Sequence, residues 1–115
     1  MTITVRKQND TAILDLSGNL ILGDAVATFR EKIQELLEAG TKAVAVNMAG
    51  VSFVDSSGIG AMVGARTGIE AAGGRCCYYA ALPRVIHTLE VSRMTEVLNL
   101  HPNEASALAS FGSTV

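Results

Sequence analysis

Two serines in the stretch Asp55-Ser56-Ser57-Gly58 are the residues best suited to chemistry in this sequence. The stretch follows an apolar run and opens a helix-like run that extends from Ile59 to Ala72. Backbone N–H groups at the start of a helix lack intrahelical partners, so a phosphate on an exposed serine there is tolerated electrostatically. We therefore interpret Ser56 as a candidate phosphate acceptor and its surroundings as a candidate switch.

Asp55 and Ser56 also have a purely structural interpretation, because both residue types are preferred helix N-caps. The two interpretations are compatible, since a residue at a helix start has its polar group at the exposed end. Ser57 is the second, less favoured acceptor. One step along a helix turns a side chain by about 100 degrees, so Ser57 is expected to point away from the direction of Ser56.

A serine hydrolase is a poor match to the sequence. Such an enzyme needs a base that a third group orients, and His87 and His101 are the only histidines. His87 lies beside the apolar face of an expected helix, His101 stands at an element boundary, and no G-x-S-x-G elbow is present. We expect both histidines at the surface and predict no catalytic residue.

The glycines and cysteines do not indicate a cofactor or a metal. Gly58, Gly60 and Gly64 are spaced one residue too widely for a dinucleotide fingerprint. Cys76 and Cys77 are adjacent, and neighbouring side chains on a strand point to opposite faces, which suits neither a disulfide nor a metal pair. The sequence therefore predicts no cofactor and no metal site.

Composition limits the classes of partner. The 115 residues carry a net charge of −2 without a basic block, which argues against direct binding of nucleic acid. No apolar run approaches the roughly 20 residues that span a bilayer, so membrane insertion is not expected. The N-terminal residues lack the pattern of a signal peptide, and unpaired cysteines suit a reducing compartment, so we predict a cytoplasmic protein.

The periodicity of apolar residues predicts an α/β fold. Alternation on either side of a Gln8-Asn9-Asp10 turn predicts an N-terminal hairpin. Asp24 is expected to cap the first helix, and Gly40 to end it. The predicted strands cover residues 2–6, 11–17, 43–48, 75–80 and 96–100, and the predicted helices cover residues 24–39, 59–72, 83–91 and 102–111.

This order of elements predicts one domain over residues 1–115, built on a mixed sheet of about five strands with about four helices. Strands joined through a helix are expected to be parallel, as for segments 43–48 and 75–80. The hydrophobic fraction of 49% is sufficient for a real core.

The chain resembles a STAS domain, and more specifically a stand-alone anti-sigma-factor antagonist. The resemblance covers essentially the whole chain. It is carried by Gly18-Asn19-Leu20, by the segment from Val51 to Gly60 that contains Asp55-Ser56-Ser57-Gly58, by Gly73-Gly74, and by residues 81–85 and 89–94.

The resemblance implies that Ser56 is the phosphorylated serine. It also implies a cycle in which the unphosphorylated protein binds an anti-sigma factor and so frees a sigma factor. That partner is often a serine kinase with a histidine-kinase-like ATP site. Phosphorylation ends the binding, and a serine phosphatase restores it. The implied partner surface consists of Leu22, Asp24, Asp55, Ser56, Ser57, Gly58 and Gly60, where the two glycines would let the partner approach.

One loop departs from the pattern of this family. Phosphorylatable antagonists commonly carry an acidic residue shortly after the glycine that ends the second strand, whereas this chain has Asn19-Leu20-Ile21-Leu22-Gly23. The departure leaves open an alternative function, in which the domain is a STAS scaffold subunit of another signalling or lipid-transport complex. In that role Ser56 need not be phosphorylated.

Overall fold

In the computed structural model of the chain, residues 1–112 are described, and they form five strands and four helices. The order of strands and helices is the predicted one. In chain order the elements are β1 (Thr2–Gln8), β2 (Thr11–Leu20), α1 (Asp24–Glu38), β3 (Ala43–Val54), α2 (Ser56–Ala71), β4 (Arg75–Tyr79), α3 (Pro83–Val91), β5 (Leu100–His101) and α4 (Glu104–Gly112).

The five strands form one mixed sheet in the order β1-β2-β3-β4-β5. The strands β1 and β2 are an antiparallel hairpin, while β2, β3, β4 and β5 pair in parallel. The predicted parallel pairing is confirmed, because Ala43 pairs with Arg75 and Asn47 with Tyr79. Each pair of consecutive parallel strands is joined by a crossover segment that returns the chain to the end of the sheet where the previous strand began.

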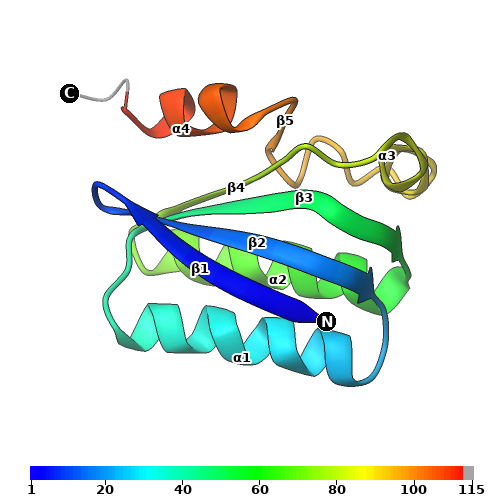
Figure 1. Ribbon diagram of the computed structural model, residues 1–115, viewed down its shortest axis with the longest axis horizontal. Coiled ribbons are helices and arrows are strands. Elements are labelled where there is room, and N and C mark those ends of the chain that lie inside the picture. Colours follow the sequence, from blue (N-terminus) through cyan, green and yellow to red (C-terminus); the bar gives the residue numbers. More distant parts are fainter. Residues whose placement is uncertain (113–115) are drawn as a thin grey trace.

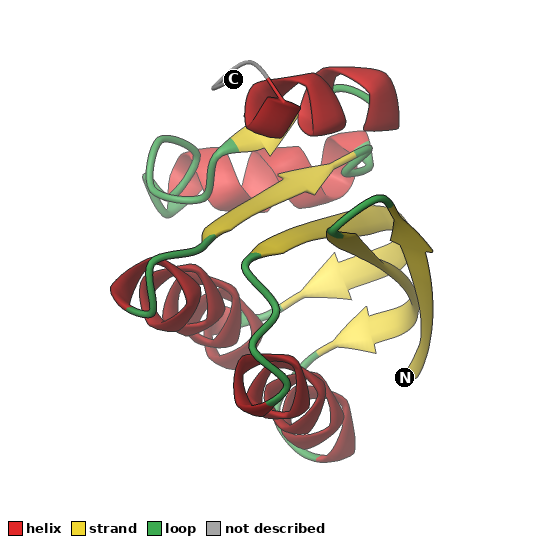
Figure 2. Ribbon diagram, turned by 90° about the vertical axis from the view of Figure 1, so that its left-hand side faces the viewer, coloured by secondary structure: helices red, strands yellow, loops and turns green. Residues whose placement is uncertain are grey.

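Helices cover both faces of this sheet (Figures 1 and 2). The larger core lies between the sheet and helices α1 and α2, and α3 adds Val85 and Leu89 to it. The smaller core lies on the opposite face, under α4, where Ala107 packs with Ile13 and Cys77. Cys76 belongs to the larger core, which confirms that the two cysteines point to opposite faces.

A polar network at the surface joins the hairpin to the C-terminal helix. Arg6 donates to both carboxylate oxygens of Asp15, at 2.6 and 3.0 Å, and to Glu104 on α4 at 2.9 Å. The Tyr79 hydroxyl donates to the same Glu104 oxygen at 2.7 Å. The Arg6 guanidinium holds the pKa of the Asp15 and Glu104 carboxyl groups below their usual values. The network therefore stays ionised at neutral pH.

All five strands differ from the prediction at one end or both. β1 ends at Gln8 and β4 at Tyr79, and the other three differences have structural reasons. β2 continues through Gly18 to Leu20, and β3 continues past residue 48 to Val54, because the two extensions pair with each other. Register shifts in this stretch break the alternation from which strands are recognised in a sequence. The last strand is Leu100–His101 rather than residues 96–100, since only this dipeptide reaches β4.

The starts of three helices also differ. The sequence predicts Asp24 as the N-cap of α1, but Asp24 is the first residue of the helix. Gly23 occupies the cap position, with φ +113°. A left-handed φ of this kind is accessible to glycine at little cost. Helix α4 begins at Glu104 instead of residue 102, and the Asn103 side chain accepts the Ser106 N–H at 2.9 Å. The start of α2 at Ser56 rather than residue 59 brings the serine into the helix.

Candidate functional site

The start of α2 is built around the side chain of Asp55, which confirms that Asp55 caps the helix. Its backbone is extended, and its carboxylate accepts the N–H of Gly58 at 2.8 Å. The other carboxylate oxygen accepts the N–H of Leu22 at 2.9 Å. One side chain therefore ties the beginning of α2 to the loop between β2 and α1.

Asp55 is charged at neutral pH. The N–H of Leu22, followed by that of Gly58, holds the pKa of the Asp55 carboxyl below its usual value of 3.8. A carboxylate at this end of a helix is also favoured by the helix dipole. The site is therefore negatively charged before any modification.

Ser56 is the first residue of α2 and is exposed to solvent. The predicted position of this hydroxyl, at the helix start and open to solvent, is confirmed. Ser57 follows in the first turn and is half-buried. Ser56 is therefore accessible from solvent without any opening of the fold.

Gly58 differs from its predicted place at the partner surface, because it is buried. A Cβ atom at this position would lie 2.0 Å from the carbonyl oxygen of Leu20 and 2.9 Å from Cγ1 of Val54. The absence of a side chain thus lets α2 start against the end of β2. Gly60 is exposed, and a Cβ there would meet nothing within 4 Å, so its backbone remains open to a partner.

Apolar side chains are exposed beside the polar helix start. Leu22 is 75% exposed on the loop that Asp55 holds, and Asp24 is exposed two residues later. Phe53 is 51% exposed two residues before Asp55. The sequence analysis does not single out Phe53. Its exposure could have been inferred from the apolar Val54 beside it, because two adjacent strand residues cannot both face one core.

In the described part of the chain, neither histidine has a hydrogen bond to Ser56. His101 is half-buried, and its ring nitrogens lie 3.1 Å from Oγ of Ser106 and 3.2 Å from Oδ1 of Asn99. The prediction that His101 is a surface residue is therefore only partly correct, while His87 on α3 is exposed. Within residues 1–112, no group of three or more His, Cys, Asp or Glu side chains could hold a metal ion. Over the same residues, no helix combines the length and hydropathy needed to cross a membrane.

A family model supplies the decisive comparison. The STAS domain model matches residues 2–107, which is nearly the whole chain. The chain belongs to the STAS domain family. This result confirms the family that the sequence motifs predicted, and the mixed sheet with its N-terminal hairpin is the fold expected for it.

Solved structures of anti-sigma factor antagonists share this fold. An anti-sigma factor antagonist from Mycobacterium paratuberculosis is 16% identical with a TM-score of 0.80, and the match covers 95% of this chain and 92% of that one. The unphosphorylated anti-sigma factor antagonist SpoIIAA is 22% identical with a TM-score of 0.73, covering 99% and 100%. Phosphorylated SpoIIAA of Bacillus is 24% identical with a TM-score of 0.70, covering 96% and 99%. At these identities the similarity concerns the fold.

Proposed function

We propose that this STAS protein is an anti-sigma-factor antagonist, a partner switch that phosphorylation of Ser56 turns off. The observation that carries the proposal is the exposed Ser56 hydroxyl at the first position of α2, beside a charged cap and an exposed Leu22. Structural relatives that are anti-sigma factor antagonists, one of them solved in both phosphorylated and unphosphorylated forms, support it.

In the proposed cycle the protein acts by binding and not by catalysis. The unphosphorylated form binds an anti-sigma factor that is also a serine kinase with a histidine-kinase-like ATP site, and thereby frees a sigma factor in the cytoplasm. The kinase then phosphorylates Ser56, the complex dissociates, and a serine phosphatase returns the protein to its binding form.

The geometry at the helix start explains how a phosphate would act. A phosphate adds about −1.5 to −2 charges at pH 7. The N–H groups of Leu22 and Gly58 are already bonded to Asp55, so the phosphate cannot take them without displacing that carboxylate. The new charge is therefore directed outward, toward the partner. Because Ser56 is exposed, the fold itself loses no buried contact.

Titrations of serine variants against the cognate anti-sigma factor test this proposal. That partner is first identified by affinity pull-down from the native cell, with mapping of the phosphorylated residue. We expect Ser56→Ala to bind and to resist switching off, and Ser56→Asp to bind at least about tenfold more weakly with an unchanged melting temperature. Ser57→Asp is the matched control. If Ser57→Asp alone weakened binding, the acceptor would be Ser57.

The scaffold function remains the second candidate, because Leu22 makes the loop before α1 apolar where related switches carry an acid. Under this function, the domain is a subunit of another signalling or lipid-transport complex. Unchanged partner binding in both Ser56 variants, together with no phosphate at Ser56 in the cell, would favour the scaffold.

A further inference from the structure

The outward face of α2 is poor in charged side chains, and the one exposed carboxylate of the helix, that of Glu70, is already paired. The charged residues of α2 are Arg66 and Glu70, which pair with each other at 2.9 Å, and Arg66 also donates to the carbonyl of Val97. Depletion of charge is typical of the centre of a protein interface. The exposed or half-buried residues along this face are Ser56, Gly60, Val63, Gly64, Thr67, Gly68 and Ala71.

At three positions on this face, no close contact inside the fold requires a glycine. A Cβ at Gly60 or Gly64 would meet nothing within 4 Å, and one at Gly68 would make an ordinary 3.7 Å contact with Leu37. None of the three has a positive φ. This distinguishes them from Gly58, whose Cβ would collide with a backbone oxygen. Glycine is among the least favourable residues in a helix interior, so its repeated use here suits a close approach from outside.

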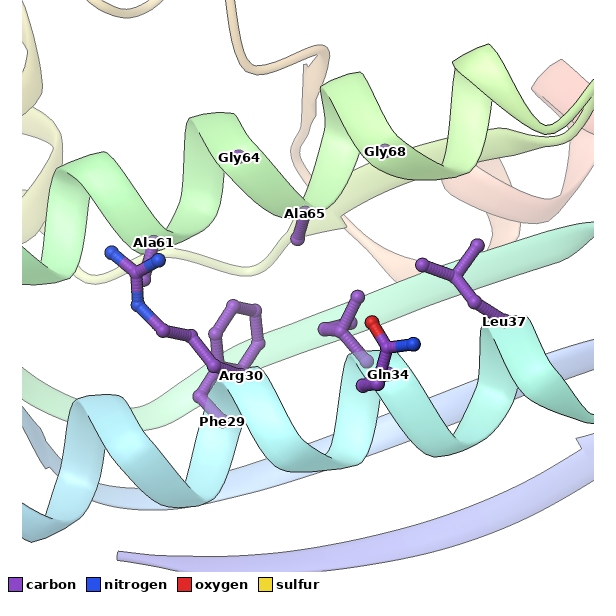
Figure 3. Close-up of a pocket in the computed structure, with 9 residues that line it drawn as sticks. Phe29, Arg30, Gln34, Leu37, Ala61, Gly64, Ala65 and Gly68 are labelled. Carbon is purple, nitrogen blue, oxygen red and sulfur yellow. The ribbon is translucent and has the colours of Figure 1, made fainter.

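A groove runs beside Gly64 and Gly68, between α1 and α2 (Figure 3). Its volume is about 260 Å³. Its floor is apolar and includes Phe29 and Ile33 from α1 and Ala65 from α2, all of them buried. Gly64 lies on the α2 wall and leaves the groove open on that side.

Arg30 is the one charged residue that lines the groove within the described part of the chain. It is exposed, and its guanidinium lies across the groove next to Ala61 (Figure 3). An occupant complementary to this groove therefore combines small or aliphatic side chains with a carboxylate opposite Arg30. Both walls of the groove are helices. Side chains four residues apart form ridges along a helix, and the ridges of a third helix can pack between those of the two walls.

We propose that a helix of the anti-sigma partner lies along the α1–α2 groove, with small side chains against Gly64 and Gly68 and an Asp or Glu on Arg30. The inference rests on the proposed function and specifies how the partner is held. Ser56 lies about two turns before Gly64 at the N-terminal end of α2, so a partner helix that extends beyond the groove in that direction reaches Ser56. A phosphate on Ser56 then meets an acidic partner helix and repels it.

Binding of the purified anti-sigma factor to groove variants of the full chain tests this inference. Gly64→Leu fills the groove with a side chain that the helix itself accommodates, and Arg30→Glu reverses the one charge. We expect each to weaken binding at least about tenfold, and Arg30→Lys to recover part of the loss. The matched controls are Ala109→Leu on the exposed side of α4 and Arg84→Glu on the exposed side of α3, which should bind like the wild type.

The outcomes separate this inference from the proposed function. Weak binding by Ser56→Asp together with normal binding by Gly64→Leu and Arg30→Glu would overturn the groove and leave the switch in place. Normal binding by all three variants would overturn both. A wild-type dimer in sedimentation experiments that Gly64→Leu converts to monomer, with partner binding unchanged, would assign the groove to a second copy of the chain and overturn the inference.

Discussion

Alanine substitutions at Gly58 and Gly64 should change the stability of the protein in opposite directions, although both glycines lie inside α2. Alanine is favoured over glycine in a helix interior by about 1 kcal/mol. At Gly64 nothing opposes this gain, because a Cβ would meet no atom within 4 Å. We expect Gly64→Ala to raise the free energy of unfolding by about 1 kcal/mol and the melting temperature by about 4 °C.

Gly58→Ala gains the same helix propensity but creates a collision. The added Cβ would lie 2.0 Å from the carbonyl oxygen of Leu20, more than 1 Å inside an ordinary contact, and that oxygen belongs to backbone held by the pairing of β2 with β3. Overpacking of this kind costs about 3 kcal/mol at the upper end of its usual range. Subtracting the gain of about 1 kcal/mol leaves a net loss of about 2 kcal/mol, or about 8 °C in melting temperature.

Urea and thermal unfolding of the two variants beside the wild type measure both effects. Gly60→Ala is the matched control, since it too is an exposed helix glycine with no atom near its Cβ, and it should follow Gly64→Ala. Wild-type stability in Gly58→Ala would refute the close approach of α2 to β2. A stability loss in Gly64→Ala would show that the groove face makes contacts within the fold.

Three further predictions concern charge and burial. Asp55→Asn should destabilise the protein at pH 6 and much less at pH 3. The reason is that the pKa of Asp55 in the folded protein lies below 3.8, so its contribution to stability is lost as the carboxylate is protonated. Urea unfolding midpoints at both pH values measure this difference. Arg6→Gln should cost about 1 kcal/mol at low ionic strength and less in 1 M NaCl, because its pairs, including the one with Glu104, are exposed; a salt-independent loss would contradict the pairing. Cys76 and Cys77 should react with a thiol reagent only after unfolding, because burial raises the pKa of both thiols to about 12; fast labelling of the native protein would contradict their burial.

Structural features that depend only on neighbouring residues in the chain could be predicted from the sequence. The sequence predicts the third helix at its observed limits, Pro83–Val91, because proline suits the first turn and the apolar spacing marks the buried side. The opposite orientations of Cys76 and Cys77 follow from the period of two in a strand. The position of Ser56 at a helix start was likewise readable, since Asp55 is a preferred cap residue.

Contacts between distant segments could not be predicted in the same way. The pairing of Leu20 with Val54 extends two strands beyond their regular alternation, and it depends on register shifts that leave no periodic signal. The burial of Gly58 depends on where β2 ends relative to α2, which one segment alone does not reveal. The groove that Arg30 crosses exists only because α1 and α2 lie side by side on one face of the sheet.

The two hydrogen bonds of Asp55 bear on how a kinase would recognise this protein. The bond to Leu22 spans 33 positions of the chain and the bond to Gly58 spans three, so the backbone of Leu22 is held beside the helix start that carries Ser56. A peptide copied from residues 50–62 contains the serine but neither Leu22 nor the helix start as the fold builds it. A kinase that recognises this arrangement would therefore phosphorylate the native domain far faster than the peptide, and would not phosphorylate unfolded chains.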